Sequence, residues 1–186
     1  MLVFFHVMAR ASFSATVIAL LPLSLAASQE SSDVPDSFKI FQQFPFAVAI
    51  SDSDNDSIFE CLTAKRAWID MDTKTGEYIW LLKGHNDNPK KTIPFYVAEG
   101  QSPDTFLFME GSDDAPAKVG KFYYADYKSC GVLDVPYNGR QCILWAEETM
   151  KDELPQECLD QFKKHCGVGI PLYQKDLCAE SEVTNW

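Results

Sequence analysis

The six cysteines of this chain constrain its fold more than any other feature, because disulfide bonds fix which distant segments lie together. All six lie beyond position 60, and none forms a Cys-x-x-Cys pair of the kind that binds structural zinc. In an oxidising compartment they predict three disulfide bonds, for which fifteen pairings are formally possible. The six positions are Cys61, Cys130, Cys142, Cys158, Cys166 and Cys178.

The start of the chain indicates such a compartment. Arg10 precedes the apolar run ATVIALLPLSLAA, which ends in small residues and is followed by the polar letters SQESSD. This pattern predicts a secretory signal peptide over residues 1–27, and the run is too short for a membrane span. Met8 begins a more conventional signal than Met1, so both residues are candidate translation starts. Residues 28–186 are then expected to form one secreted, extracellular domain.

The charge balance argues against nucleic acids and anionic membranes as partners. The chain has 16 basic and 27 acidic residues, and removal of Arg10 with the leader leaves 15 basic residues and a net charge of −12. Such a protein repels polyanions, although acidity also serves solubility alone. The sequence Asn55-Asp56-Ser57 is an N-glycosylation sequon in a polar stretch, which predicts a glycan on Asn55.

Most of the chain has the pattern of short β-strands. Eight runs rich in aromatic and β-branched residues follow one another, with turn signals such as Asn138-Gly139 between them. This pattern is typical of an up-and-down barrel or a sandwich, and an eight-stranded barrel has room for one small ligand. The runs span residues 46–50, 58–72, 77–84, 91–100, 104–111, 120–127, 130–135 and 140–147.

Two segments outside these runs predict helices. Residues 36–44 begin with an N-cap candidate and stop at Pro45. Residues 154–166 carry apolar side chains at helical spacing. Cys158 and Cys166 lie in this second helix, roughly 12 Å apart along its axis, so they cannot bond to each other but can face the same sheet.

The hairpin around Asn138-Gly139 decides whether Cys130 bonds to Cys142. A two-residue turn sets Cys130 opposite Glu147, whereas a three-residue loop sets it opposite Ala146. In either register Cys142 lies four or five residues further along its strand, about 13–16 Å away. A disulfide allows only ~7 Å between Cα atoms, so the two cysteines are not partners. The simplest arrangement is two disulfide bonds from this strand pair to the C-terminal helix. Cys61 is then left to pair with Cys178.

Five stretches of the chain occur together in one known family. They are FEC in the second run, SPDTFLF, YADYKSCGVLDVPYNGRQCILW, LPQECLDQFKKHCG and YQKDLC, and they cover nearly all of the secreted part. In these stretches the chain resembles tick salivary lipocalins of the histamine-binding protein family. The resemblance implies a mainly β fold, an eight-stranded antiparallel up-and-down lipocalin-type barrel with a short N-terminal helix and a C-terminal helix packed outside. The Gly-x-Trp of lipocalins at large is missing from the first strand.

The resemblance also implies the disulfide pairings. Cys61 pairs with Cys178 and Cys130 with Cys158 in the family generally, and Cys142 pairs with Cys166 in its six-cysteine members. It favours the three-residue hairpin loop, because only that register directs both strand cysteines outward to the helix. Four hairpin residues then face the barrel interior, namely Gly131, Leu133, Ile143 and Trp145.

The resemblance further implies that the protein sequesters a small host inflammatory mediator. The ligand would be a biogenic amine such as histamine or serotonin, or a lipid mediator such as a leukotriene. Amine-binding members resemble one another in an Asp and a Glu that pair with the amine, and Gly131 and Ile143 occupy those positions here. Glu99 and Glu110 are alternative counter-charges at strand ends. A second hypothesis is a protein-binding inhibitor of complement or another host defence protein, with the barrel as scaffold.

Alternation along the strands supplies the candidate ligand-binding residues. Arg66 and Trp68 lie on the face opposite Cys61, and an arginine near the mouth of an apolar slot suits a lipid carboxylate. The face of Tyr78 and Trp80 stays undecided, and aromatic residues inside a barrel also serve as core filler. The candidate set is Arg66, Trp68, Phe106, Phe108, Tyr123, Ile143 and Trp145.

The sequence gives no indication of catalysis. His6 belongs to the leader, and His85 and His165 have no neighbouring nucleophile or metal-ligand spacing. We therefore expect a monomeric binding protein with surface histidines, without enzymatic activity, cofactor or metal.

Overall fold

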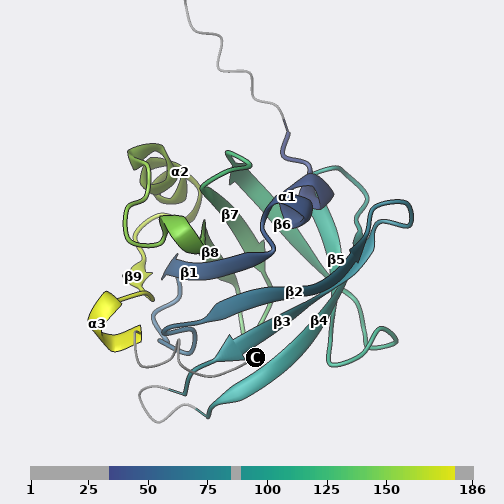
Figure 1. Ribbon diagram of the computed structural model, residues 1–186, viewed down its shortest axis with the longest axis horizontal. Helices are drawn as coiled ribbons and strands as arrows, with labels where there is room; N and C mark the ends of the chain where they lie inside the picture. The colour runs from purple at the N-terminus through teal and green to yellow at the C-terminus, as the bar shows by residue number, and fades with distance from the viewer. Residues whose placement is uncertain (1–33, 85–88, 179–186) are drawn as a thin grey trace, which may run out of the picture. The chain divides into compact units, whose positions relative to one another are not determined.

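Eight antiparallel strands form a closed barrel in the computed structural model, which describes residues 34–84 and 89–178. The predicted signal peptide and His85 lie outside the described residues. The strands pair in chain order from β2 to β8, and β1 closes the ring by pairing with both β8 and β2 (Figure 1). They are β1 (Phe46–Asp52), β2 (Thr63–Asp70), β3 (Thr75–Leu82), β4 (Lys91–Glu99), β5 (Thr105–Glu110), β6 (Lys118–Ala125), β7 (Cys130–Val135) and β8 (Gln141–Glu147).

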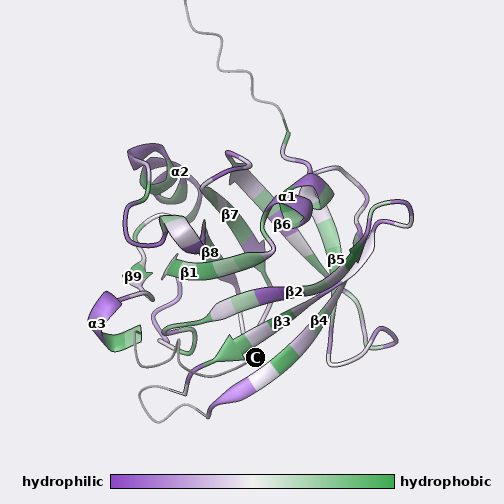
Figure 2. Cartoon of the chain, in the orientation of Figure 1, coloured by the Kyte–Doolittle hydropathy of each residue, from purple (hydrophilic) through white to green (hydrophobic). Residues whose placement is uncertain are grey.

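This topology confirms the predicted eight-stranded antiparallel barrel. Hydrophobic and hydrophilic residues alternate along β4, as Figure 2 shows, because successive side chains of a strand point to opposite faces. The closing seam is short, since β1 and β2 share only three residue pairs, from Phe46↔Lys65 to Val48↔Thr63. Beyond the seam, β1 pairs with the two-residue strand β9 (Ile170–Pro171).

The helical elements lie before and after the barrel strands. They are α1 (Ser37–Gln43), the 3₁₀ turn η1 (Glu148–Met150), α2 (Gln156–Cys166) and α3 (Lys175–Cys178). The carboxylate of Asp36 accepts the backbone N–H of Lys39 at 2.9 Å and caps α1, which ends before Pro45. None of the described helices is long and apolar enough to cross a membrane.

The β7–β8 hairpin has the register of the three-residue loop. Cys130 lies opposite Ala146, and the ladder ends at Val135↔Gln141. Asn138 and Gly139 both have positive φ angles, which their residue types adopt readily. The hairpin therefore turns both of its cysteines to the outer face.

Three disulfide bonds connect the barrel to the C-terminal elements. Cys61–Cys178, Cys130–Cys158 and Cys142–Cys166 have Cα–Cα distances of 5.4, 6.1 and 5.6 Å. These are the pairings that the resemblance implies. The two α2 bonds form part of a small apolar cluster outside the barrel, in which Phe162 of α2 packs with Val132 and Leu144.

Candidate functional site

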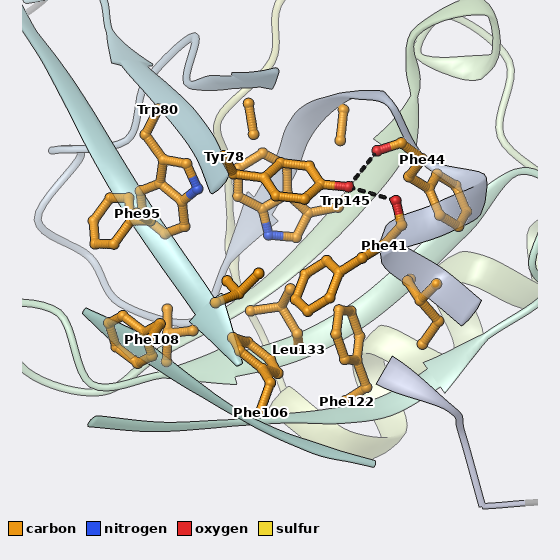
Figure 3. A pocket seen from close by; sticks show the side chains of 16 residues that line it. Phe41, Phe44, Tyr78, Trp80, Phe95, Phe106, Phe108, Phe122, Leu133 and Trp145 are labelled. Carbon is orange, nitrogen blue, oxygen red and sulfur yellow. Dashed lines mark hydrogen bonds between the residues drawn. The ribbon is translucent and has the colours of Figure 1, made fainter. Parts of the chain in front are cut away.

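The barrel encloses a cavity of about 70 Å³. Sixteen residues line it, and nine of them are Phe, Tyr or Trp (Figure 3). None of these described lining residues carries a charge. Since a water molecule occupies about 30 Å³ and a cavity of roughly 150 Å³ binds benzene, the interior in this conformation is nearly filled by its own side chains.

Helix α1 forms one wall of the cavity. The ring of Phe41 lies 5.0 Å from that of Phe106 and 5.5 Å from that of Phe122, both edge-to-face. Arg66 donates from Nη1 to the carbonyls of Phe41 and Gln42, each at 2.8 Å. These contacts supply donors to carbonyl groups at the end of the helix, which have no partner within the helix, and they place a cation where the helix dipole favours one.

Tyr78 forms hydrogen bonds with the end of the same helix from inside the barrel. Its hydroxyl lies 2.7 Å from the carbonyl of Phe41 and 2.8 Å from that of Phe44, and donates to them. Burial raises the pKa of Tyr78 above its usual range, with a smaller opposing effect from Arg66. The phenol is therefore a neutral donor at physiological pH, and its only polar atom is already committed to α1.

Other contacts set the shape of the aromatic lining. Phe59 and Tyr137 pack against Trp80 with ring centroids 5.4 and 6.0 Å away. Gly120 lies beneath the ring of Phe106, where a Cβ atom would come within 2.3 Å of that ring. The ring of Phe106 therefore occupies a position that only glycine beneath it allows.

Trp145 is the one lining residue with an unsatisfied polar group. It is 6% exposed, and no hydrogen-bond acceptor lies within reach of its Nε1 among the described residues. Its ladder neighbours are small, with Gly131 across β7 and Ala49 across β1. Figure 3 shows its indole nitrogen on the ring edge that faces the middle of the lining group.

Three of the predicted site residues line the cavity, and a fourth lies close by. Phe106, Phe108 and Trp145 point into it. Ile143 is fully buried in the inner core but is not among the lining residues. The two positions at which the resemblance implies an Asp and a Glu are thus a glycine on the cavity wall and a core isoleucine.

The other three predicted residues do not reach the cavity. Arg66 is engaged with α1, as described above. Trp68 is 44% exposed and donates to Glu77 at 2.9 Å, because a register shift after Arg66 turns it outward. Tyr123 stacks on His165 of α2, outside the barrel, with 5.2 Å between ring centroids. The register of β6 instead turns Phe122 inward, and Tyr123 sits at a shift between Phe122 and Tyr124.

Sequence reasoning missed the lining residues of α1 and β4, and it left the face of β3 open. Alternation in the β4 stretch IPFYV, which buries Phe95 and Val97, could have identified two of them. The helix at residues 36–44 was predicted, but nothing in its sequence says which end of the barrel it covers. The additional lining residues are Ile40, Phe41, Phe44, Ala47, Ala64, Tyr78, Trp80, Phe95, Val97, Phe122 and Val135.

The carboxylates proposed as alternative counter-charges lie elsewhere. Glu99 is exposed, and Glu110 pairs with Lys118 at 3.8 Å. Among the described residues, one group could bring metal ligands together, Asp126 with Cys130 and Cys158. The two sulfur atoms of that group are bonded to each other, so it offers no thiolate.

Comparison with known proteins agrees with the barrel fold. The sequence profile of the tick histamine binding protein family matches residues 26–180. The chain belongs to this family. No curated protein sequence matches the chain. Family membership and fold together identify a lipocalin of the kind that binds small ligands.

Solved structures with the same fold include two with a bound ligand. AM182 in a serotonin complex has a TM-score of 0.55 and 14% identity, covering 74% of this chain and 88% of that one. Japanin from Rhipicephalus appendiculatus, bound to cholesterol, has a TM-score of 0.50 and 14% identity, covering 70% and 94%. Lobster apocrustacyanin A1 has a TM-score of 0.55 and 12% identity, covering 76% and 83%. At these identities the similarity concerns the fold alone.

Proposed function

We propose that this family member is a secreted protein that sequesters a small, uncharged, apolar host mediator inside its barrel and so helps to evade host defence. The observation that carries this proposal is the lining of the cavity, which contains no carboxylate among the described residues. An ammonium ion transferred into such a lining would lose its hydration without gaining a counter-charge, which costs several kcal/mol. Of the two mediator classes, the structure therefore favours the lipid over the amine.

The proposal also specifies the charge of the lipid. An anionic lipid would need a cation in the cavity, and Arg66, the arginine first considered for that role, donates to the carbonyls of α1 instead. Secretion is supported by the leader pattern of residues 1–27 and by the three disulfide bonds.

Ligand entry requires room that the described conformation does not provide. A cavity of about 70 Å³ is about half the size of a cavity of roughly 150 Å³ that binds benzene. Helix α1 is the wall best suited to move, because it contributes Ile40 and Phe41 to the lining, its C-cap residue Phe44 also lines the cavity, and it has only seven residues. We expect α1 to shift outward when a ligand binds.

A matched set of naphthalene probes tests the proposal. Naphthyl methyl ketone, naphthoate and naphthylmethylammonium share one ring system and differ in charge. Calorimetry and native mass spectrometry of the secreted protein should find binding that is tightest for the neutral ketone and weakest for the ammonium. Histamine and serotonin serve as physiological amines. Tighter binding of the ammonium probe, or of either amine, than of the ketone would overturn the proposal.

A second candidate function is binding of a host defence protein on the outer surface. The small interior favours it, and so does a larger hollow of about 310 Å³ outside β1 and β2, next to the Cys61–Cys178 bond. If none of the probes or amines binds, this second function is the better account, and complement components are the first partners to assay.

A further inference from the structure

We infer that the indole N–H of Trp145 is a specificity determinant, which selects ligands that carry a hydrogen-bond acceptor such as a ketone, ester or hydroxyl oxygen. This inference rests on the proposed function and narrows its ligand class from apolar molecules in general to apolar molecules with one buried oxygen.

The first step is that Nε1 of Trp145 is an exception among buried polar groups. Such groups are nearly always hydrogen-bonded, and an indole nitrogen can only donate. Three described side-chain atoms lack a partner, namely Thr63 Oγ1, Gln141 Oε1 and Trp145 Nε1. Of these three residues, Trp145 is the one that lines the barrel cavity.

The second step is that the surrounding protein has no acceptor to offer. Trp145 faces Gly131 and Ala49 across the two neighbouring strands, and neither has a polar side chain. The ring of Trp80 lies 5.6 Å away at a tilt of 49°, so it offers at most the weak acceptor of a π face. The hydroxyl of Tyr78, the remaining side-chain oxygen in the lining, donates to the carbonyls of α1 and makes no hydrogen bond with Nε1 of Trp145.

The third step concerns where a ligand atom would lie. Trp145 lines the cavity, and its cross-strand neighbour Gly131, which also lines it, has no side chain that could accept from the indole; a ligand oxygen would therefore lie in the cavity beside Nε1. An oxygen at that point would accept from Nε1 while the rest of the ligand packs against the aromatic rings. A donor left unpaired in the free protein makes such a bond more favourable, so an acceptor should tighten binding about tenfold.

The test compares two probes of nearly the same shape, naphthyl methyl ketone and isopropenylnaphthalene, in which a CH₂ group replaces the ketone oxygen. The wild-type protein should bind the ketone about tenfold more tightly. Trp145→Phe should reduce this ratio to about one. Trp68→Phe, which removes an exposed indole outside the barrel, should keep it. The comparison of two probes within each variant cancels the general effect of the substitution on packing.

A spectroscopic reading keeps the inference testable if Trp145→Phe fails to fold. In wild-type protein labelled with ¹⁵N, the Trp145 indole N–H resonance should move downfield with the ketone and stay in place with the hydrocarbon. Equal affinity for both probes and no selective shift would overturn the role of Trp145 while leaving the proposed function intact. Failure of both probes to bind would instead overturn the proposed function.

Discussion

Gly131 shows how one residue sets the polarity of the cavity. It lines the wall opposite Trp145, and a Cβ atom added there would meet no atom closer than 3.5 Å. A short side chain therefore fits at its first atom. We predict that Gly131→Asp places a carboxylate in the cavity, lowers the melting temperature and raises the affinity for naphthylmethylammonium and serotonin about tenfold or more.

The control for this prediction is Gly131→Asn, which has the same shape without the charge. Calorimetry at neutral pH should find the gain in amine affinity with Asp and not with Asn. Equal amine affinities of the two variants would show that a carboxylate at position 131 does not face the ligand.

Asp52 makes stability depend on pH. Its carboxyl group is 2% exposed at the end of β1, and burial raises its pKa to about 7, with smaller contributions from the nearby Asp54 and Asp56. Because the folded pKa lies above the unfolded value of 3.8, this residue favours folding fully below about pH 4. That contribution is lost as the pH rises to about 7, by at most about 1.4 kcal/mol per pH unit.

We therefore predict that Asp52→Asn stabilises the protein at pH 8 relative to wild type and has little effect at pH 4. The amide oxygen can still accept the backbone N–H of Asp54, which donates to Asp52 at 3.1 Å. Urea unfolding at several pH values measures the difference, and Asp113→Asn, an exposed acid, serves as control. A constant difference between Asp52→Asn and wild type from pH 4 to 8 would contradict the assignment.

At the scale of elements, α1 depends on the barrel for its structure. A seven-residue helix is not stable alone, and the side chains of Arg66 and Tyr78 hold its last carbonyls. We predict that Arg66→Ala lowers the free energy of unfolding by roughly 1–3 kcal/mol and speeds ligand association, because Phe41 can then leave the cavity more easily. Stopped-flow binding and urea unfolding measure both effects.

Gln42→Ala is the matched control, since it alters an exposed side chain of α1 and keeps the backbone carbonyl that Arg66 contacts. An association rate that is unchanged in Arg66→Ala would mean that ligands enter by another route than the α1 end of the barrel.

The positions of the strands could be predicted from sequence. Which side chains of β2 and β6 point into the barrel could not. Alternation along β2 agrees with the position of Ala64 on the cavity wall, whereas the side chain of Arg66 turns to α1. The extra residue Ala67 has no partner in β3, and Trp68 then faces outward. In β6, three consecutive aromatic residues leave no alternating pattern to follow. Both irregularities depend on pairing with a neighbouring strand, which local sequence does not encode.

At the scale of the whole molecule, strand register alone excludes a bond between Cys130 and Cys142, whereas the three pairings themselves were implied by the resemblance to the family. The hairpin register fixes which face Cys130 and Cys142 share, and α2 presents Cys158 and Cys166 to that face. The cavity volume was not accessible to sequence, since it depends on how nine aromatic rings and α1 pack together. A barrel predicted to hold a ligand is therefore found nearly filled.

The three bonds should not contribute equally to stability. Cys61–Cys178 spans 117 residues, whereas Cys142–Cys166 spans 24. In the chain-entropy description the stabilisation grows as 1.5RT times the logarithm of the loop length, which favours the longer loop by about 1.4 kcal/mol. In each case the two remaining disulfide bonds stay intact and shorten the loop in the unfolded chain, by a similar factor for both loops. The difference in stabilisation between the two bonds is therefore nearly unchanged.

We predict that replacing Cys61 and Cys178 by Ala lowers the free energy of unfolding more than replacing Cys142 and Cys166 does, by about 1.4 kcal/mol. Packing acts in the same direction, because Cys61 and Cys178 are both buried while Cys166 is partly exposed. Urea unfolding of the two double variants without ligand gives the comparison. An equal or reversed order would mean that the bonds to α2 stabilise through native packing with Phe162, Val132 and Leu144, rather than through restriction of the unfolded chain.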